Sequence, residues 1–308
     1  CLMPVVLGIC AAAKIPASRQ LMPLAYAAGI GGVITMVGTP PNIIVSGVLT
    51  SFGYESFSFF EFAWIGIPLT FVVIAYMMFI GKYLLPKAEL DADQEIEQEI
   101  EATVTDSKKQ IVSGLILAVC IIVMALDLKA ISLEMTAIVG ALVCVLTGCL
   151  TEKQAYSAID WVTIFLFAGM MPVSAAMDKT GAGKLIAEWA VSLMGGSPTP
   201  IIMTSVLFII SCTLTQFMSN TAACALLAPV GVAISQQLGA SPKAVLMAIG
   251  VAASCAFATP VGTPPCTLVL GPGGYKFMDY VKVGVPLVVL CFIVSIIVIP
   301  MVWPFFPG

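Results

Sequence analysis

The chain has 308 residues, of which 60% are hydrophobic and only 10% are charged, and its mean hydropathy is +1.07. A soluble domain carries about 25% charged residues, so this composition excludes an ordinary water-soluble globule. Four stretches contain no Lys, Arg, Asp or Glu, at residues 20–54, 189–242, 244–275 and 283–308. Because a bilayer crossing needs about 20 apolar residues, we predict an all-α polytopic protein of the inner or plasma membrane, embedded in the lipid bilayer.

The net charge of −4 belongs mainly to one segment, because eight of the 17 acidic residues lie between Glu89 and Asp106. The sequence has no basic stripe, so we expect no nucleic-acid partner. The ten cysteines form no Cys-x-x-Cys pair, and His is absent. A Cys/His metal site is therefore not expected, and we interpret the cysteines as small buried residues.

The chain begins at Cys1 inside an apolar run, and no charged segment of a signal peptide precedes it. We therefore expect that an upstream segment is missing. Apolar runs predict helices near residues 1–13, 20–36, 66–85, 110–126, 133–150, 160–178, 200–217, 221–236, 243–258 and 281–303. Shorter helical pieces are expected at about 43–52 and 267–271.

Two of these runs, at residues 201–217 and 222–235, are short for full crossings. The polar triplet at residues 219–221 lies between them. Backbone can leave the helix at membrane depth only where protein or a water-filled cavity receives its polar groups. We therefore predict a re-entrant hairpin with the triplet at its tip.

The acidic segment at residues 87–109 has no apolar face, so it predicts a solvated linker rather than a metal site. It divides the chain into a first part at 1–86 and a second part at 110–308. A cytoplasmic linker would place nine basic residues inside (Lys14, Arg19, Lys82, Lys87, Lys108, Lys109, Lys153, Lys276 and Lys282) and four outside (Lys129, Lys179, Lys184 and Lys243). This distribution agrees with the positive-inside rule.

The chain also repeats itself. Residues 35–41 and 259–265 are identical at six of seven positions and share the ending Val-Gly-Thr-Pro-Pro. A Leu-x-Pro-Val sequence precedes each copy, at residues 2–5 and 227–230, and a Gly-x-Pro sequence follows each copy. A duplication of this kind inside a membrane protein indicates a transporter built from repeats.

The Gly-Thr-Pro-Pro sequence should break the helix in which it lies, because proline removes a backbone donor and clashes with the preceding turn. The break frees carbonyl groups, which suit Na⁺, and amide groups at a helix N-terminus, which suit an anion. The triplet adds hydroxyl and amide groups. Alternatively, the prolines only kink packed helices and the triplet is an interhelical hydrogen-bonding cluster.

The motifs Gly38-Thr39-Pro40-Pro41-Asn42, Ser219-Asn220-Thr221 and Gly262-Thr263-Pro264-Pro265 resemble the signature of the divalent anion/Na⁺ symporters. That family includes dicarboxylate, citrate and sulfate carriers. The resemblance covers essentially the whole chain. It implies an elevator-type homodimer in which two inverted repeats build a scaffold domain and a transport domain.

The resemblance also implies two sets of site residues. The substrate anion would be bound by residues of the three motifs, namely Ser219, Asn220, Thr221, Thr39, Thr263 and Pro264. One Na⁺ would be bound by side chains and carbonyl groups of Thr215, Met218, Asn220 and Gly262. A carbonyl group of Gly38 would contribute to a second Na⁺ site.

The sequence departs from the family pattern at two places. A first Ser-Asn-Thr tip is expected just before Cys1 and is absent, which leaves one Na⁺ site incomplete, so we expect the 308 residues alone not to transport. Cys266 stands where the first copy of the motif has Asn42. This difference should weaken a polar contact behind the second loop.

The sequence therefore predicts a secondary active transporter that couples Na⁺ to the symport of a small divalent anion. The proposed site has no Lys or Arg, so Na⁺ and helix N-termini would have to offset the substrate's charge. A proton-coupled or antiporting carrier of the arsenite or citrate–metal type is the alternative. An anion channel or a membrane sensor is less favoured. An intramembrane enzyme is least favoured, since there is no His and no Gly-x-Ser-x-Gly sequence.

Overall fold

The computed structural model describes residues 2–86, 107–126, 132–159 and 199–306, with scattered positions between 161 and 192. Every regular element in these parts of the chain is helical. The predicted helix at 160–178 lies largely outside the described residues, as does the acidic linker up to residue 106. The next helix begins at Ser107, three residues before the predicted start at residue 110.

The helices of the first part are α1 (Met3–Ala13), α2 (Leu21–Gly31), α3 (Pro40–Ser51), α4 (Ala63–Tyr76) and α5 (Lys82–Leu84), with a π-helical turn at Met77–Gly81. Then come α7 (Ser107–Ala125), α8 (Leu133–Leu146) and α9 (Glu152–Ser157). The last group is α12 (Pro200–Phe217), α13 (Asn220–Leu238), α14 (Pro242–Ser254), α15 (Pro264–Leu270) and α16 (Phe277–Val302).

In the described parts of the chain, five helical stretches are long and apolar enough to cross a membrane: Ala63–Leu84, Lys108–Ala125, Pro200–Phe217, Asn220–Leu238 and Phe277–Val302. With the composition, they identify a multi-pass membrane protein. The prediction that the arms around residues 219–221 are too short to cross is wrong, because α13 continues through two glutamines to Leu238. Length therefore does not favour a hairpin, and any argument for one must come from the arrangement of the helices.

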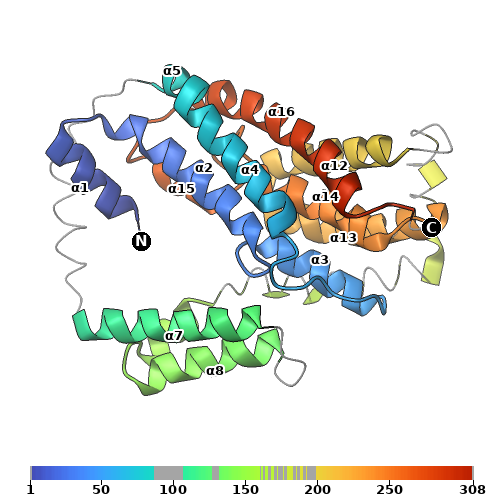
Figure 1. Ribbon diagram of the computed structural model, residues 1–308, viewed down its shortest axis with the longest axis horizontal. Coiled ribbons are helices and arrows are strands. Elements are labelled where there is room, and N and C mark those ends of the chain that lie inside the picture. Colours follow the sequence, from blue (N-terminus) through green and yellow to red (C-terminus); the bar gives the residue numbers. More distant parts are fainter. Residues whose placement is uncertain are drawn as a thin grey trace.

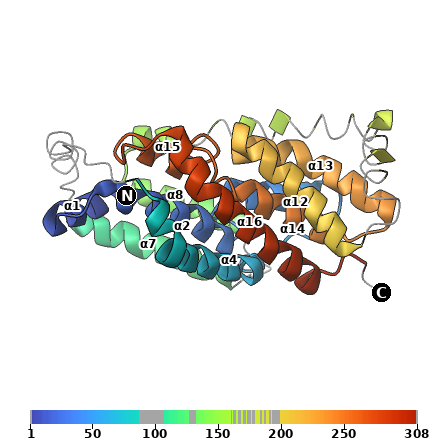
Figure 2. The ribbon, with the colours of Figure 1, turned by 90° about the horizontal axis from the view of Figure 1, so that it is seen from above.

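The helices form one packed body and a separate pair (Figures 1 and 2). In the packed body, α14 contacts α3, α12 and α13, α4 packs against α2 and α16, and α16 also packs on α12. The pair α7–α8 is antiparallel, since the Cys149 thiol lies 3.7 Å from the Lys109 carbonyl oxygen. Two tyrosines connect the first part of the chain to the last part by hydrogen bonds. Tyr26 donates to the Phe257 carbonyl (2.8 Å), and Tyr76 donates to the Val283 carbonyl (2.7 Å).

Polar contacts connect the start of α4, the start of α14 and the end of α16 at one end of the molecule. The Trp303 indole donates a hydrogen bond to Glu61 (2.9 Å), and the Lys243 ammonium lies 3.5 Å from the same carboxylate. The Ser241 amide donates to the Phe305 carbonyl (2.6 Å). The outer ends of α12 and α13 both lie toward this end, at the right of Figure 1. The two helices are therefore antiparallel and form a hairpin, with residues 218–219 at its tip.

Two helices are broken at the repeated motif, as predicted. Residues 32–39 separate α2 from α3, and residues 255–263 separate α14 from α15. The break is complete rather than a kink, because Thr39 and Thr263 both have extended backbone. A proline then opens each second half-helix, where its missing N–H has no intrahelical partner to lose. With 11 and 12 residues, α2 and α3 are about 16 and 18 Å long, so their break lies near the middle of a membrane-length element.

The repeated Gly-x-Pro sequences pack in the same way on the two breaks. A Cβ atom added at Gly66 in α4 would lie 2.8 Å from the Ile34 Cα. One added at Gly284 in α16 would lie 2.7 Å from the Ala258 Cα and would overlap the Phe257 carbonyl. Ile34 and Ala258 each stand one residue before the repeated seven-residue sequence. In both copies, a helix backbone therefore lies directly against the backbone of the break.

This contact predicts that Gly284→Ala destabilises the protein by about 1–3 kcal/mol, because the new methyl group meets backbone that cannot rotate away. Gly114→Ala is the matched control, since its methyl group would have no neighbour within 4 Å. Thermal unfolding of the detergent-purified full-length protein measures both. An unchanged unfolding temperature for Gly284→Ala would contradict the packing described.

Candidate ion and anion site

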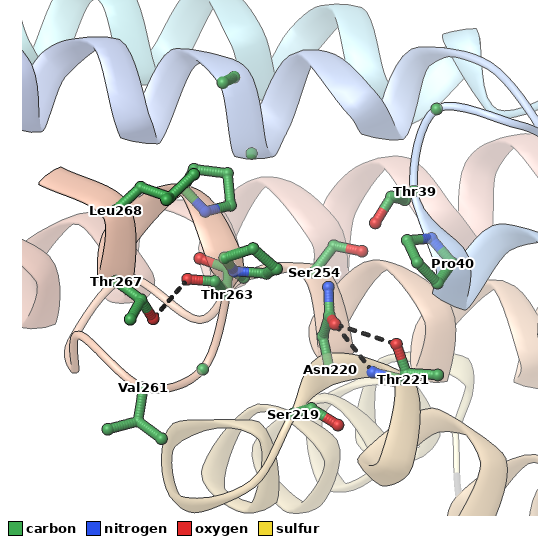
Figure 3. A pocket seen from close by; sticks show the side chains of 16 residues that line it. Thr39, Pro40, Ser219, Asn220, Thr221, Ser254, Val261, Thr263, Thr267 and Leu268 are labelled. Carbon is green, nitrogen blue, oxygen red and sulfur yellow. Dashed lines mark hydrogen bonds between the residues drawn. The ribbon is translucent and has the colours of Figure 1, made fainter. Parts of the chain in front are cut away.

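The two breaks and the hairpin tip enclose one cavity of about 600 Å³ (Figure 3). All six residues predicted to bind the anion line it, together with Gly38 and Gly262. Thr215 and Met218, predicted to bind Na⁺, do not line the cavity and lie just behind the tip. None of the residues lining the cavity is charged; they are Ala28, Gly29, Gly38, Thr39, Pro40, Ser219, Asn220, Thr221, Ser254, Val261, Gly262, Thr263, Pro264, Pro265, Thr267 and Leu268.

Helix N-termini supply the positive side of this cavity. Thr39 is the N-cap of α3 and Ser219 is the N-cap of α13. The Ser219 hydroxyl oxygen accepts a hydrogen bond from the Ala222 amide (3.2 Å), which fixes the first turn of α13. The N-termini of both helices therefore lie beside the cavity, where the helix dipoles favour an anion. The free amide groups expected from the sequence are not found there. Pro40 and Pro41 have no N–H, the Asn42 amide donates to the Thr39 carbonyl (3.1 Å), and the first amides of α13 donate to oxygens of Gly262, Asn220 and Ser219.

Asn220 occupies the centre of the site. Its main-chain amide donates a hydrogen bond to the Gly262 carbonyl (3.2 Å), which joins the hairpin tip to the second break. Its side-chain oxygen accepts from the Thr221 amide (2.8 Å) and lies 3.4 Å from the Thr221 hydroxyl. Figure 3 shows the side chain standing between Thr263 and Thr39, with its amide nitrogen directed away from Thr221.

Two donors at the cavity wall make no hydrogen bond to a described residue. They are the Asn220 side-chain nitrogen and the Thr39 hydroxyl, on residues that are each only 6% exposed and that line the cavity. Both donors are therefore available to a ligand in the cavity. A ligand that accepts hydrogen bonds, such as a carboxylate or sulfate oxygen, would satisfy both donors.

The residues predicted to bind Na⁺ converge on the junction between α12 and the second break. Thr215 is fully buried, and its hydroxyl donates to the Ala253 carbonyl (2.9 Å), which leaves the oxygen lone pairs for a cation. Gly262 packs against it so closely that an added Cβ would lie 2.6 Å from the Thr215 carbonyl oxygen. Met218 has extended backbone, so its carbonyl takes no part in the helical hydrogen bonds of α12. These ligands are all neutral oxygens, which a hard cation such as Na⁺ prefers to nitrogen or sulfur.

Gly38, the predicted ligand of a second Na⁺, lies on the opposite side of the cavity. Its backbone is held in a tight loop, where its amide donates to the Thr35 carbonyl (3.2 Å) and a Cβ atom would overlap the Gly32 carbonyl. No group of three or more His, Cys, Asp or Glu residues gathers as a metal site in the described parts of the chain.

Three residues that the sequence analysis did not single out also shape the site. Ser254 ends α14, is 2% exposed and lines the cavity. The Thr267 hydroxyl donates to the Pro260 carbonyl (2.6 Å) and so closes the second loop. Gln216 holds the second break from outside the cavity. The repeat offers no signal for Ser254, because the corresponding position in the first copy is the buried Ile30.

Asn42 lies behind the first loop rather than in the cavity. Its side-chain nitrogen donates to the Thr35 carbonyl (2.9 Å) and to the Val33 carbonyl (3.3 Å). Cys266, at the corresponding place in the second copy, is also buried, and its main-chain carbonyl accepts a hydrogen bond from Tyr280 (2.7 Å). The second copy therefore has a buried thiol where the first copy has an amide that donates to two carbonyl groups.

Comparison with known proteins gives relatives that are transporters. The chain is 34% identical over 287 residues to an uncharacterized transporter of Haemophilus influenzae, which covers 89% of this chain and 60% of the relative. It is 41% identical over 171 residues to the uncharacterized transporter YfbS of Escherichia coli, which covers 54% of this chain and 28% of the relative.

A more distant relative has an assigned activity. The sodium-dependent dicarboxylate transporter SdcS of Staphylococcus aureus is 26% identical over 310 residues, which covers 94% of this chain and 59% of the relative. The chain thus spans 28–60% of the length of these curated relatives. The family model described as citrate transporter matches residues 1–131 and 118–306. The chain therefore belongs to the citrate transporter family, a family of membrane transporters and not of enzymes.

Proposed function

We propose that this chain is the major part of a secondary active transporter that moves a small divalent anion together with Na⁺. A C4-dicarboxylate, citrate or sulfate has the required charge and acceptor oxygens. The observation that carries the proposal is the pair of unpartnered donors, Asn220 and Thr39, beside helix N-termini in a cavity lined only by uncharged residues. The activity of the relative SdcS, as its name gives it, points the same way.

The absence of charge along the cavity is the basis of the coupling. Two negative charges placed at membrane depth are strongly unfavourable unless something offsets them. The helix dipoles supply roughly half a charge each, which is less than a divalent anion needs. Na⁺ bound by Thr215, Met218, Asn220 and Gly262 would supply the rest, so the anion should bind well only after Na⁺.

The lining also favours Na⁺ over a proton as the coupling ion. A proton-coupled carrier needs a group that titrates near the substrate. The chain has no His, and no Asp or Glu is among the described residues that line the cavity. A proton-coupled or antiporting carrier of the arsenite or citrate–metal type, or a channel or sensor, is therefore the second choice. Na⁺ dependence of uptake separates these alternatives from the main proposal.

We further propose an elevator-type homodimer in the inner or plasma membrane, with two inverted repeats at residues 1–86 and 110–308. The equivalent packing of Gly66 and Gly284 on the two breaks supports the repeat. The α12–α13 hairpin would be re-entrant, because both outer ends lie toward one end of the molecule and its tip meets the central break. The pair α7–α8 would belong to the scaffold.

This function predicts Na⁺-dependent uptake of labelled succinate, citrate or sulfate by the full-length protein in proteoliposomes. An inward Na⁺ gradient should raise the initial rate at least tenfold over K⁺ controls for one of these anions. A pH gradient without Na⁺ should have no such effect. Uptake driven by the pH gradient alone would contradict Na⁺ coupling and favour the second choice.

Two substitutions should separate the effect on Na⁺ binding from the effect on anion binding. Asn220→Asp removes the unpartnered donor and sets a negative charge before the anion, so the KM for substrate should rise more than tenfold. Thr215→Ala removes only a Na⁺ ligand, so the Na⁺ concentration for half-maximal uptake should rise by about three- to tenfold while the substrate KM at saturating Na⁺ changes little.

The control is Gln237→Glu, the same amide-to-carboxylate change on the exposed part of α13. It should leave unchanged both the KM for substrate and the Na⁺ concentration for half-maximal uptake. If Asn220→Asp behaves like this control, Asn220 does not contact the anion, and the triplet serves only to pack the helices.

A further inference from the structure

We infer that Gln216 is a positioning residue that braces the second break and so sets the geometry of the Na⁺ site, the role that Asn42 has for the first break. The role in Na⁺ binding rests on the function proposed above, whereas the bracing rests on contacts alone. Gln216 is one residue from the C-terminal end of α12 and does not line the cavity.

Gln216 satisfies the backbone groups that the break sets free. Its side-chain nitrogen donates to the Cys255 carbonyl (3.2 Å) and to the Cys212 carbonyl in its own helix (3.0 Å). Its side-chain oxygen accepts from the Ala258 amide (3.0 Å). Cys255 and Ala258 both follow Ser254, where α14 ends, so one amide side chain pairs with a carbonyl and an amide of the unwound segment.

The main chain of the same residue makes a further contact. The Gln216 carbonyl accepts a hydrogen bond from the Thr259 hydroxyl at 2.7 Å. The side-chain nitrogen, the side-chain oxygen and the main-chain carbonyl of Gln216 therefore all hold the segment from Cys255 to Thr259 against the end of α12. Because the side-chain nitrogen and oxygen are occupied by protein groups, Gln216 acts through the loop rather than on a ligand.

The first break has the same sequence motif and a different brace. Asn42 reaches back from the second half-helix to the carbonyls of Val33 and Thr35, inside its own copy of the repeat. The second copy has Cys266 at this place, and a thiol cannot donate to two carbonyls. Its brace comes instead from another helix, which ties the second break to the hairpin.

This brace acts on the residues that would bind Na⁺. Gln216 stands between Thr215 and Met218 in sequence, and the segment it holds leads directly to Gly262. Gly262 in turn touches the Thr215 carbonyl and accepts a hydrogen bond from the Asn220 amide. If the segment shifts by even part of an ångström, the oxygens of Gly262 and Thr215 no longer face the same point.

The test uses Gln216→Leu in the full-length protein, with Gln237→Leu on the exposed part of α13 as the matched control. Amide hydrogen exchange of peptides covering residues 256–263 reports the brace directly. Na⁺ and substrate titrations of uptake report its effect on the site. We expect at least tenfold faster exchange and a three- to tenfold higher Na⁺ requirement in Gln216→Leu, with the maximal rate nearly kept and no change in the control.

A second variant covers the case in which Gln216→Leu does not fold. An ionised Gln216→Glu side chain keeps an acceptor for the Ala258 amide and loses both donated bonds, so the same changes should occur in weaker form. Wild-type exchange in either folded variant would overturn the brace. Faster exchange with an unchanged Na⁺ requirement would overturn the positioning role.

Rescue tests the equivalence with Asn42. In the double variant Gln216→Leu, Cys266→Asn, the new amide can donate to the carbonyls of Phe257 and Thr259, which correspond to Val33 and Thr35. Exchange and Na⁺ requirement should return toward wild type, and no return would overturn the equivalence. If the wild type shows no Na⁺ dependence at all, the proposed function fails, while the exchange measurement still decides the bracing.

Discussion

The structure depends on one constraint: backbone groups set free inside a membrane must find partners in the protein, because lipid offers none. Each break leaves carbonyl and amide groups that a continuous helix would satisfy. Here polar side chains satisfy them. Tyr26 reaches the Phe257 carbonyl and Gln216 reaches Cys255 and Ala258 from distant parts of the chain, whereas Asn42 reaches Val33 and Thr35 within its own copy of the repeat. The breaks persist because these side chains hydrogen-bond the backbone groups that the helices release.

The same constraint explains why the site can work without charged side chains. The fold brings the N-termini of α3 and α13, the polar side chains of Thr39 and Asn220, and carbonyl groups at the end of α12 and in the second break near one another. Together they offer helix dipoles and side-chain donors to an anion and acceptors to a cation. A fixed Lys would hold an anion at all times, whereas this site should hold one only when Na⁺ is present, and that condition is the physical meaning of coupling.

The sequence predicted the broken helices and the cavity residues well, because Gly-Thr-Pro-Pro and Ser-Asn-Thr change the backbone locally. It predicted helix ends less well. The apolar run of α13 stops before Gln236, but the helix continues until Gly239, whose positive φ of 62° ends it. Likewise α16 begins at Phe277, where the Asp279 carboxylate accepts from the Lys276 amide, rather than at the apolar run near 281.

The braces could not be predicted, because they join positions far apart in sequence. Gln216 and Ala258 are 42 residues apart, and nothing around Gln216 distinguishes it from any polar residue near a helix end. Ser254 carries no motif either, and only the fold brings it to the cavity. Local backbone chemistry is visible in a sequence, whereas the choice of partner for a freed backbone group depends on the packing of the whole chain.

The central claim is that cation and anion bind one uncharged site and stabilise each other. Equilibrium binding of labelled Na⁺ to the purified full-length protein, measured with and without the transported anion, tests it most directly. Linkage requires that each ligand raise the affinity for the other by the same factor. We predict that saturating anion lowers the Na⁺ dissociation constant at least tenfold, and that Na⁺ lowers the anion's by the same factor. Independent binding of the two ligands would contradict the account.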